Sequence, residues 1–186
     1  MTFTHLRSSL LFSLIAFYAT FFSAALTAEN IIFSDNFDNC SIDSWTTTSG
    51  TSPNVPWIFD TPTNANMPNT SIDGSCFAYF DDDILGADTL INGTFLVSPT
   101  FDALPYSTIS LEYDLHFKNT ANFTSSLELM ISNGTETTTI ATFREDIGTS
   151  FADAQTQTMD ISGFRSDNMS VFFLYKDGGG QAYWAG

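Results

Sequence analysis

Apolar and polar residues alternate without a break along residues 107–117. One side of an extended chain would carry Ile109, Leu111, Tyr113, Leu115 and Phe117, and the other side Ser110, Glu112, Asp114 and His116. A period of two residues is the pattern of a β-strand with one buried face. We therefore expect a strand here, with His116 on its exposed polar face beside Asp114.

The alternation returns in residues 127–131 and is followed directly by a turn signal. Asn133-Gly134 comes next, and Asn-Gly between apolar runs predicts a β-hairpin. Residues 137–143 are the predicted return strand. Residues 171–175 are apolar on both sides of the chain, which indicates a central strand of a sandwich.

Other short runs rich in β-branched and aromatic residues predict further strands at 31–33, 57–60, 76–80 and 94–97. The polar stretches 46–56 and 61–74 are predicted to be long loops. Apolar spacings of three and four are not sustained, so no helix is expected after residue 28. The pattern therefore indicates one all-β sandwich domain.

Residues 1–28 have the layout of a secretory signal peptide. Arg7 precedes an apolar run that extends to about Ala25, and the segment ends in small residues at Ala28. Cleavage would leave residues 29–186 as the mature domain. The alternative is an uncleaved membrane anchor, but the run is shorter than the roughly 20 residues that a span requires. We expect a secreted or cell-surface protein with no membrane insertion after cleavage.

The net charge of the chain argues against some classes of binding partner. The chain of 186 residues has 21 acidic residues against five Lys and Arg, a formal net charge of -16, and 43% hydrophobic residues. That apolar content supports a packed core. Nucleic-acid binding is excluded because a basic surface is needed to displace counterions from phosphates. Anionic membrane surfaces are disfavoured for the same reason.

Two cysteines, Cys40 and Cys76, are too few for a four-cysteine zinc site. In an exported chain a disulfide between them is favoured, and it would stabilise the fold by about 3–4 kcal/mol. Two unpaired buried thiols are the alternative. Six tripeptides match the N-glycosylation acceptor pattern and begin at Asn39, Asn69, Asn92, Asn122, Asn133 and Asn168.

The order of several short motifs resembles a known family. The motifs are Asp35-Asn36-Phe37-Asp38, Ser44-Trp45, Gly74-Ser75-Cys76-Phe77-Ala78-Tyr79-Phe80, Leu96-Val97-Ser98-Pro99 and Tyr183-Trp184-Ala185-Gly186. This order resembles MAM-like jelly-roll domains, and most closely the bacterial cleaved adhesin domain family. The resemblance implies an antiparallel jelly-roll β-sandwich. That family carries Glu where this chain has Asp38, and it closes with one more strand, so the chain is expected to lack its last strand.

Acidic residues suggest a calcium site. By resemblance, Asp35 and Asp38 match positions that hold a structural calcium in such domains. The charge pattern adds a dense acidic run, Asp81, Asp82 and Asp83 with Asp88, because calcium binds six to eight hard oxygens on irregular loops. The alternative for this run is a solvated acidic loop, since successive residues of an extended chain point in opposite directions.

Catalysis has little support in the sequence. After the leader the one histidine is His116, which any Ser-His-Asp arrangement would have to use. No serine lies in a Gly-x-Ser-x-Gly pattern. A pair of carboxylates could cleave a glycoside, but any acidic protein offers such pairs. We predict that the chain is not an enzyme.

Large aromatic residues offer a different chemistry. Trp45, Trp57 and Trp184 are predicted to lie in or beside loops, where their ring faces could stack on sugars. The alternative is that they fill the core, as large aromatic residues commonly do. The resulting hypothesis is a non-catalytic module for adhesion or recognition that binds extracellular protein or carbohydrate. The alternative hypothesis is an accessory domain of a secreted protease or glycosidase.

Overall fold

The computed structural model describes residues 30–49, 56–60, 75–81, 93–119, 125–148, 154–177 and 184–185. Contacts divide the chain into two compact units, residues 1–30 and 31–186. The predicted leader lies outside the described residues. Every described strand belongs to the second unit.

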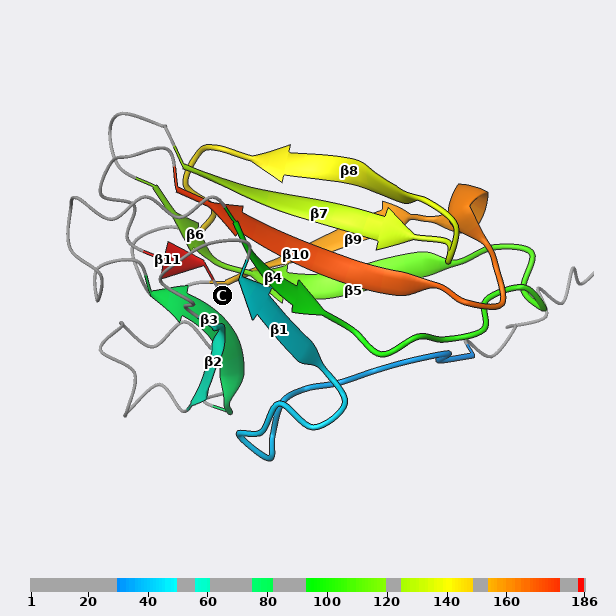
Figure 1. Cartoon of the computed structure of the whole chain (residues 1–186), viewed down its shortest axis with the longest axis horizontal. Helices are drawn as coiled ribbons and strands as arrows, with labels where there is room; N and C mark the ends of the chain where they lie inside the picture. The colour runs from blue at the N-terminus through cyan, green and yellow to red at the C-terminus, as the bar shows by residue number, and fades with distance from the viewer. Residues whose placement is uncertain are drawn as a thin grey trace, which may run out of the picture. The chain divides into compact units, whose positions relative to one another are not determined.

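The first layer of the second unit is a five-stranded antiparallel sheet. Its order is β1 (Thr46–Ser49), β4 (Thr94–Val97), β10 (Ser170–Lys176), β7 (Ser126–Ser132) and β8 (Thr137–Phe143). The prediction of a central strand at residues 171–175 is confirmed, because β10 lies in the middle and pairs with β4 and β7 (Figure 1).

The second layer consists of two smaller sheets. One has the order β2 (Ile58–Asp60), β3 (Phe77–Asp81), β11 (Trp184–Ala185) and β6 (Phe117–Lys118). The other pairs β5 (Ser110–Leu115) with β9 (Gln155–Asp160). A single residue, His116, separates β5 from β6, so these two strands follow one line in the layer. A short 3-10 helix, η2 (Ser162–Phe164), follows β9.

The two layers enclose the core, and the fold is an antiparallel jelly-roll β-sandwich. Phe80 of the second layer and Tyr175 of the first have ring centroids 4.6 Å apart, and both side chains are fully buried. A second cluster brings Leu129 and Val171 of the five-stranded sheet together with Ile109 and Ile161. The predicted fold class is therefore confirmed.

The predicted hairpin is present with the predicted boundaries. β7 and β8 pair antiparallel around Asn133-Gly134, and Gly134 has a φ of 85°. That left-handed conformation favours glycine. The Asn133 side-chain oxygen accepts hydrogen bonds from the backbone N–H groups of Thr135 and Glu136, both at 2.9 Å. This local chemistry explains why the turn could be read from the sequence.

Three predictions about strands were wrong. Residues 31–33 form no strand. The first residues of the predicted loop at 46–56 form β1, whose sequence is entirely polar. β9 was not predicted, because only one of its six residues is apolar. None of the described residues form a helix long and apolar enough to cross a membrane.

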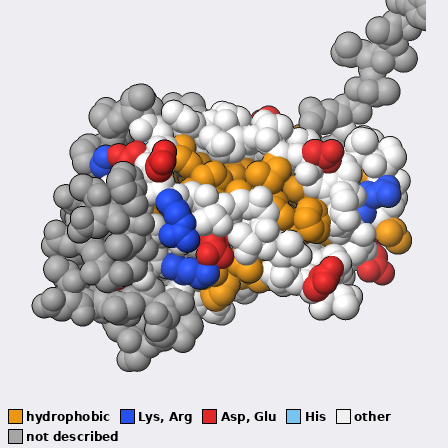
Figure 2. Space-filling model, turned by 90° about the horizontal axis from the view of Figure 1, so that it is seen from above, with side chains coloured by type: hydrophobic (Ala, Val, Ile, Leu, Met, Phe, Trp, Pro, Cys, Tyr) orange, Lys and Arg blue, Asp and Glu red, His pale blue; other side chains and the backbone are white. Residues whose placement is uncertain are grey.

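One side of the sandwich exposes part of the core. Figure 2 looks onto the side where β8 lies and shows apolar side chains gathered in a stripe. The half-buried apolar residues of β8 and β9 are Ile140, Ala141 and Phe143 in β8 and Met159 in β9, and all four pack against the second core cluster. β8 and β9 are edge strands of their sheets. Among the described residues, no further strand covers the core on this side.

Candidate functional site

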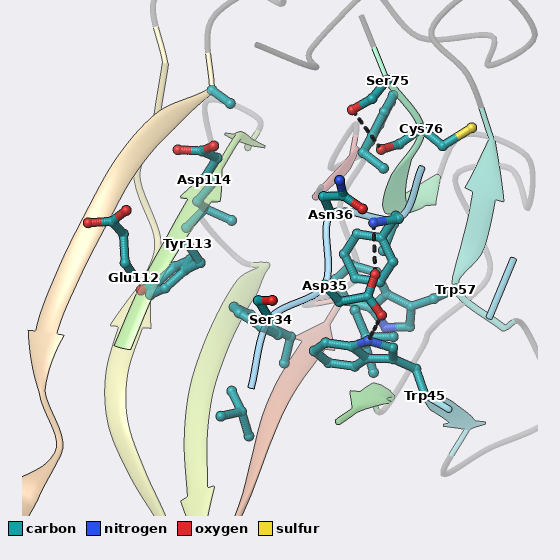
Figure 3. A pocket seen from close by; sticks show the side chains of 18 of the residues that line it. Ser34, Asp35, Asn36, Trp45, Trp57, Ser75, Cys76, Glu112, Tyr113 and Asp114 are labelled. Atoms are coloured by element: carbon teal, nitrogen blue, oxygen red, sulfur yellow. Dashed lines mark hydrogen bonds between the residues drawn. The ribbon is translucent and has the colours of Figure 1, made fainter. Parts of the chain in front are cut away.

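A pocket of about 450 Å³ lies between the two layers (Figure 3). One wall is β5, from Leu111 to Leu115. The opposite wall combines the start of β3, from Ser75 to Ala78, with the segment from Phe33 to Phe37. Side chains of the five-stranded sheet complete the lining, with Leu96, Val171 and Phe173 among them. The pocket is thus lined mainly by apolar groups, and its polar residues come from the two walls.

Asp35 anchors one wall of the pocket. One carboxylate oxygen accepts a hydrogen bond from the Trp45 ring N–H at 2.8 Å, and the other accepts one from the backbone N–H of Phe37 at 2.8 Å. Phe37 in turn packs on Trp45, with ring centroids 5.4 Å apart. Asp35 therefore fixes the path of the segment from Phe33 to Phe37.

Tyr113 projects from the other wall into the sandwich. Its ring meets Phe173 edge to face at 5.4 Å. Its hydroxyl oxygen is buried and has no hydrogen-bond partner within the described part of the chain. Burial raises the pKa of the Tyr113 hydroxyl to about 12. An unpaired buried hydroxyl is costly, so this group marks a place where the pocket lacks a polar partner.

Two of the tryptophans that were predicted to bind a ligand line the pocket as part of the core. Trp45 and Trp57 are only 8% and 5% exposed and belong to the first core cluster. The Trp57 ring N–H donates a hydrogen bond to the backbone carbonyl of Thr94 at 3.3 Å. Neither ring offers a stacking face on the surface, which agrees with the core alternative. The side chain of Trp184 lies outside the described residues.

The predicted calcium ligands are not gathered into one site by the described residues. Both Asp35 oxygens already accept hydrogen bonds, and one Asp38 oxygen accepts one from the Asn36 side chain at 2.5 Å. Asp81 is buried at the end of β3. Within the described ranges, no three His, Cys, Asp or Glu side chains lie close enough to hold a metal ion. Asp82, Asp83 and Asp88 lie outside those ranges, so calcium binding stays a prediction.

The expectation that His116 is exposed was wrong. Its side chain is 1% exposed, and it lies between β5 and β6. The strand alternation breaks here, because Leu115, His116 and Phe117 are all buried in succession. Asp114 stays exposed and accepts a hydrogen bond from the Thr156 hydroxyl at 2.6 Å. A Ser-His-Asp arrangement built on an exposed His116 is therefore not formed.

A carboxylate near His116 anchors the end of β6. Lys118 forms an ion pair with Asp146, and the backbone N–H of Asn119 donates to the same carboxylate at 2.9 Å. Partial burial acts to raise the pKa of Asp146, but the hydrogen bonds from Lys118 and Asn119 and the charges of Lys118 and His116 outweigh it and lower the pKa below its usual value. Asp146 is therefore held in its ionised form.

The predicted disulfide is confirmed. Cys40 and Cys76 are bonded, and their Cα atoms lie 5.2 Å apart. The bond joins the loop before β1 to the residue that precedes β3. It therefore fastens the N-terminal segment beside one wall of the pocket.

A second candidate site, which we call the outer face, lies on the side of the five-stranded sheet turned away from the core. Val171, Phe173 and Tyr175 of β10 pack in the core clusters, so Phe172 and Leu174 point the opposite way. Pairing of β10 with β4 and β7 places four residues beside Phe172 and Leu174. Phe172 lies opposite Val97 and Met130, and Leu174 lies opposite Phe95 and Glu128.

The outer face is a contiguous apolar surface with a polar border. Its members are Phe95, Val97, Met130, Phe172 and Leu174, of which all but Leu174 are half-buried. Thr46 and Thr48 of β1 lie opposite Val97 and Phe95. The five-stranded sheet lies in front of β5 and β9 in Figure 1. The apolar character of both sides of residues 171–175 was the signal in the sequence, but it was used to predict only a central position.

No family model and no curated protein matches this chain. Among solved structures, the fold is similar to that of the carbohydrate-binding module TmCBM61 in complex with β-1,4-galactotriose. The TM-score is 0.52 at 10% identity, over 80% of this chain and 87% of the module. A Stig cyclase, Fisc from Fischerella sp. TAU, gives 0.46 at 15% identity over 88% of this chain and 87% of the cyclase, which is too low to carry an argument. The similarity to the module shows the fold alone.

Proposed function

We propose that this chain is a non-catalytic extracellular recognition module that binds carbohydrate on the outer face. The observation that carries the proposal is the group of half-buried apolar residues Phe95, Val97, Met130 and Phe172 on the outer side of the five-stranded sheet. Soluble proteins rarely leave contiguous apolar surface exposed unless it contacts a ligand or a partner. Phe95 and Phe172 come from adjacent strands on the same side of the sheet, at diagonal positions.

Sugars suit such a surface because one side of a pyranose ring presents C–H groups and its rim presents hydroxyls. The phenylalanine rings would contact the C–H groups. The bordering hydroxyl groups of Thr46 and Thr48 would contact the sugar hydroxyls, and the Glu128 carboxylate, which already pairs with Lys176 at 2.6 Å, borders the same surface. Binding sites commonly combine an apolar lining with a few polar groups that fix orientation. Similarity in fold to a carbohydrate-binding module supports this choice of ligand.

Charge and the predicted leader support an extracellular setting. The formal net charge of -16 disfavours polyanionic partners, and neutral glycans carry no such penalty. The disulfide between Cys40 and Cys76 is of the kind that persists in oxidising compartments. The proposal assigns no catalytic residue.

Affinity electrophoresis against a panel of soluble neutral polysaccharides, with β-1,4-galactan included, would test the proposal. We expect at least one polysaccharide to retard the protein. Phe172→Ala and Phe95→Ala should each weaken that retardation about tenfold, a loss of about 1.4 kcal/mol. Leu104→Ala is the matched control, because Leu104 is 60% exposed and lies outside the outer face.

Thermal melting of each variant separates lost binding from lost folding. Unchanged retardation in both phenylalanine variants would contradict the outer face as the site. If no polysaccharide is retarded while an extracellular protein binds and depends on Phe172, the ligand is a protein and the carbohydrate assignment is wrong.

A further inference from the structure

One line of side chains crosses all five strands of the outer face, and we call it the cross-strand row. Its members lie directly opposite one another in the strand pairing: Thr46 on β1, Val97 on β4, Phe172 on β10, Met130 on β7 and Thr139 on β8. Directly opposite residues of antiparallel strands have their side chains on the same face of the sheet. The row therefore presents three apolar side chains in its middle and a threonine hydroxyl at each end.

A hydrogen bond on β8 shows that the row continues to the edge of the sheet. A register shift interrupts the pairing of β7 with β8 beside Met130. Beyond it, the Thr139 hydroxyl donates a hydrogen bond to the Glu128 carboxylate at 3.4 Å, and Glu128 lies on the outer face opposite Leu174. The Thr139 side chain is therefore on the outer face as well. A hydroxyl that donates its hydrogen keeps lone pairs that can accept, so Thr139 can accept a hydrogen bond from a ligand at this end of the row.

The accessible apolar surface is longer across the strands than along β10. On the same side of β10, the neighbours of Phe172 are Ser170 and Leu174, which are only 7% and 5% exposed. Along β10, the half-buried Phe172 ring thus lies between two buried residues. Across the sheet, it continues into the half-buried side chains of Val97 and Met130. An extended ligand gains more apolar contact when it lies across the strands.

The flanks of the row determine the charge of a suitable ligand. The five members of the row are uncharged. On one flank, the Glu128 carboxylate pairs with Lys176 at 2.6 Å, so the two charges balance each other. On the other flank, Ser132 of β7 and Thr137 of β8 lie opposite each other and add hydroxyl groups. A neutral ligand with many hydroxyls suits this surface better than an ionic one.

The spacing of the strands determines how long the ligand is. Neighbouring strands lie about 4.8 Å apart, so five strands carry the row over about 19 Å. One pyranose unit of an extended chain covers about one such interval, so about four units span the row. β1 and β8 are the outermost strands of this sheet (Figure 1), and no described strand lies beyond them in it. A longer chain can therefore continue past both ends.

We propose that the outer face binds an internal stretch of a linear, neutral polysaccharide that lies across the strands along the cross-strand row. This inference rests on the carbohydrate function proposed above, and adds to it the orientation, the length and the type of ligand. Phe172 contacts the C–H groups of a central sugar. Thr46 and Thr139 bind hydroxyls of the sugars at the two ends of the row. The site recognises the body of a polysaccharide and not its terminal unit.

Calorimetric titration with β-1,4-galacto-oligosaccharides of two to six units tests the length. If a different polysaccharide of the panel retards the protein, the oligosaccharides are cut from that one instead. We expect Kd to fall about tenfold or more from two units to four, and to change less than about twofold from four units to six, because the row is then filled. Reducing the terminal aldehyde of the longest oligosaccharide to an alcohol should leave its Kd unchanged, because no chain end is bound.

Threonine-to-valine substitutions test the two ends of the row, since valine keeps the shape of the side chain and removes the hydroxyl. Thr46→Val and Thr139→Val should each weaken binding of the four-unit ligand about threefold, as expected for one neutral hydrogen bond. Neither should affect the two-unit ligand, which is too short to reach the ends. The effects should multiply in the double variant, because the two sites are far apart. Thr142→Val is the matched control, because Thr142 is exposed on β8 but lies opposite Glu128, outside the row.

The outcomes separate this inference from the proposed function. If no polysaccharide and no oligosaccharide binds, the carbohydrate function is wrong and the inference fails with it. If binding depends on Phe172 but is complete with two units, or is lost when the terminal aldehyde is reduced, the outer face binds a chain end and the inference alone is wrong. If Thr142→Val weakens the four-unit ligand as much as Thr139→Val, or neither end of the row contributes, the ligand does not lie across the strands.

Discussion

Backbone pairing is continuous across the strands of the first layer of the sandwich but not across those of the second. In the five-stranded sheet, β10 pairs with β7 from Ser170 to Lys176 and with β4 along all of β4. In the second layer, β5 pairs on one edge only among the described strands, and the two-residue β11 is the link between β3 and β6. The first layer is one continuous sheet, and the second consists of two separate sheets beside the pocket.

Side-chain burial follows the same division. Leu127, Leu129 and Ile131 on β7 are essentially inaccessible, whereas Leu111 and Tyr113 on β5 are half-buried. A strand with partners on both edges is held in position by its neighbours, which favours close packing of its inner face, as on β7. This difference teaches that β7 packs more closely against the core than the part of β5 that lines the pocket.

Breaking the disulfide should have the largest effect, because it removes the covalent tie beside the pocket. We expect the double variant Cys40→Ser and Cys76→Ser to lose about 4 kcal/mol of unfolding free energy, from the added conformational freedom of a 36-residue loop in the unfolded chain. Urea denaturation would measure it. A loss below about 1 kcal/mol would show that the wall of the pocket holds without this bond.

The same substitution in each layer would sharpen the comparison directly. Leu129→Ala in β7 should cost about 3 kcal/mol, because the side chain is fully buried and leaves a cavity. Leu111→Ala in β5 should cost about 1 kcal/mol, because its side chain is half-buried beside the pocket. Both values come from urea denaturation, and equal losses would contradict the unequal packing of the layers.

Removing the unpaired hydroxyl should stabilise the second layer. Tyr113→Phe is expected to gain about 1 kcal/mol at neutral pH, since the buried oxygen has no partner. The pKa of Tyr113 is raised from 10.0 to about 12, so the folded state favours the neutral phenol. The free energy of unfolding of the parent is therefore independent of this group's ionisation below pH 10 and decreases between about pH 10 and 12, because the unfolded chain loses the proton first. Melting curves across this range should fall more steeply for the parent than for the variant.

A smaller effect is expected at Asp146, where the pKa is lowered by its hydrogen bonds and by Lys118. Such a group stabilises the fold above its unfolded pKa, which is 3.8, and this contribution is lost as pH falls through the folded pKa. Asp146→Asn should therefore melt lower than the parent at pH 7 and equally at about pH 2. The loss should be below about 1 kcal/mol, since the pair is partly exposed. Glu145→Gln, at the exposed neighbouring position, is the control.

Calcium should have the smallest effect on this chain. Asp35 and Asp38 already accept hydrogen bonds, so we expect millimolar calcium to raise Tm by no more than about 2 °C. Melting in calcium and in a chelator would measure the difference. A much larger rise would mean that the acids at positions 82, 83 and 88 complete a site.

The parts of the fold with strong local signals could be predicted from the sequence. The β7–β8 hairpin needed only alternation and Asn-Gly, and β4 and β10 needed only short apolar runs. β1 and β9 could not be predicted in this way, because Thr-Thr-Thr-Ser and Gln-Thr-Gln-Thr-Met-Asp carry almost no apolar residues. β1 is a strand because it pairs with β4, and β9 is a strand because it pairs with β5. The residues that determine this pairing lie elsewhere in the sequence.

The candidate sites show the same limit. Sequence reasoning chose Trp45 and Trp57 because tryptophans contact ligands, yet these rings are enclosed by the two layers. His116 fits the alternation in the sequence, but Leu115, His116 and Phe117 are all buried, so burial at this end of the strand does not follow the alternation. The outer face depends on cross-strand register, since Phe95 and Phe172 are far apart in the sequence. The pocket depends on residues far apart in the sequence, since Asp35, Cys76 and Tyr113 all line it.

The central place of β10 also determines when the fold can be assembled. β4 and β7 have no contact along their edges until residues 170–176 lie between them, whereas the β7–β8 hairpin closes locally. Pairings between residues far apart in sequence are slow to form. A chain synthesised as far as β9 therefore presents two open strand edges, at β4 and at β7, and open edges are where unfinished chains join one another.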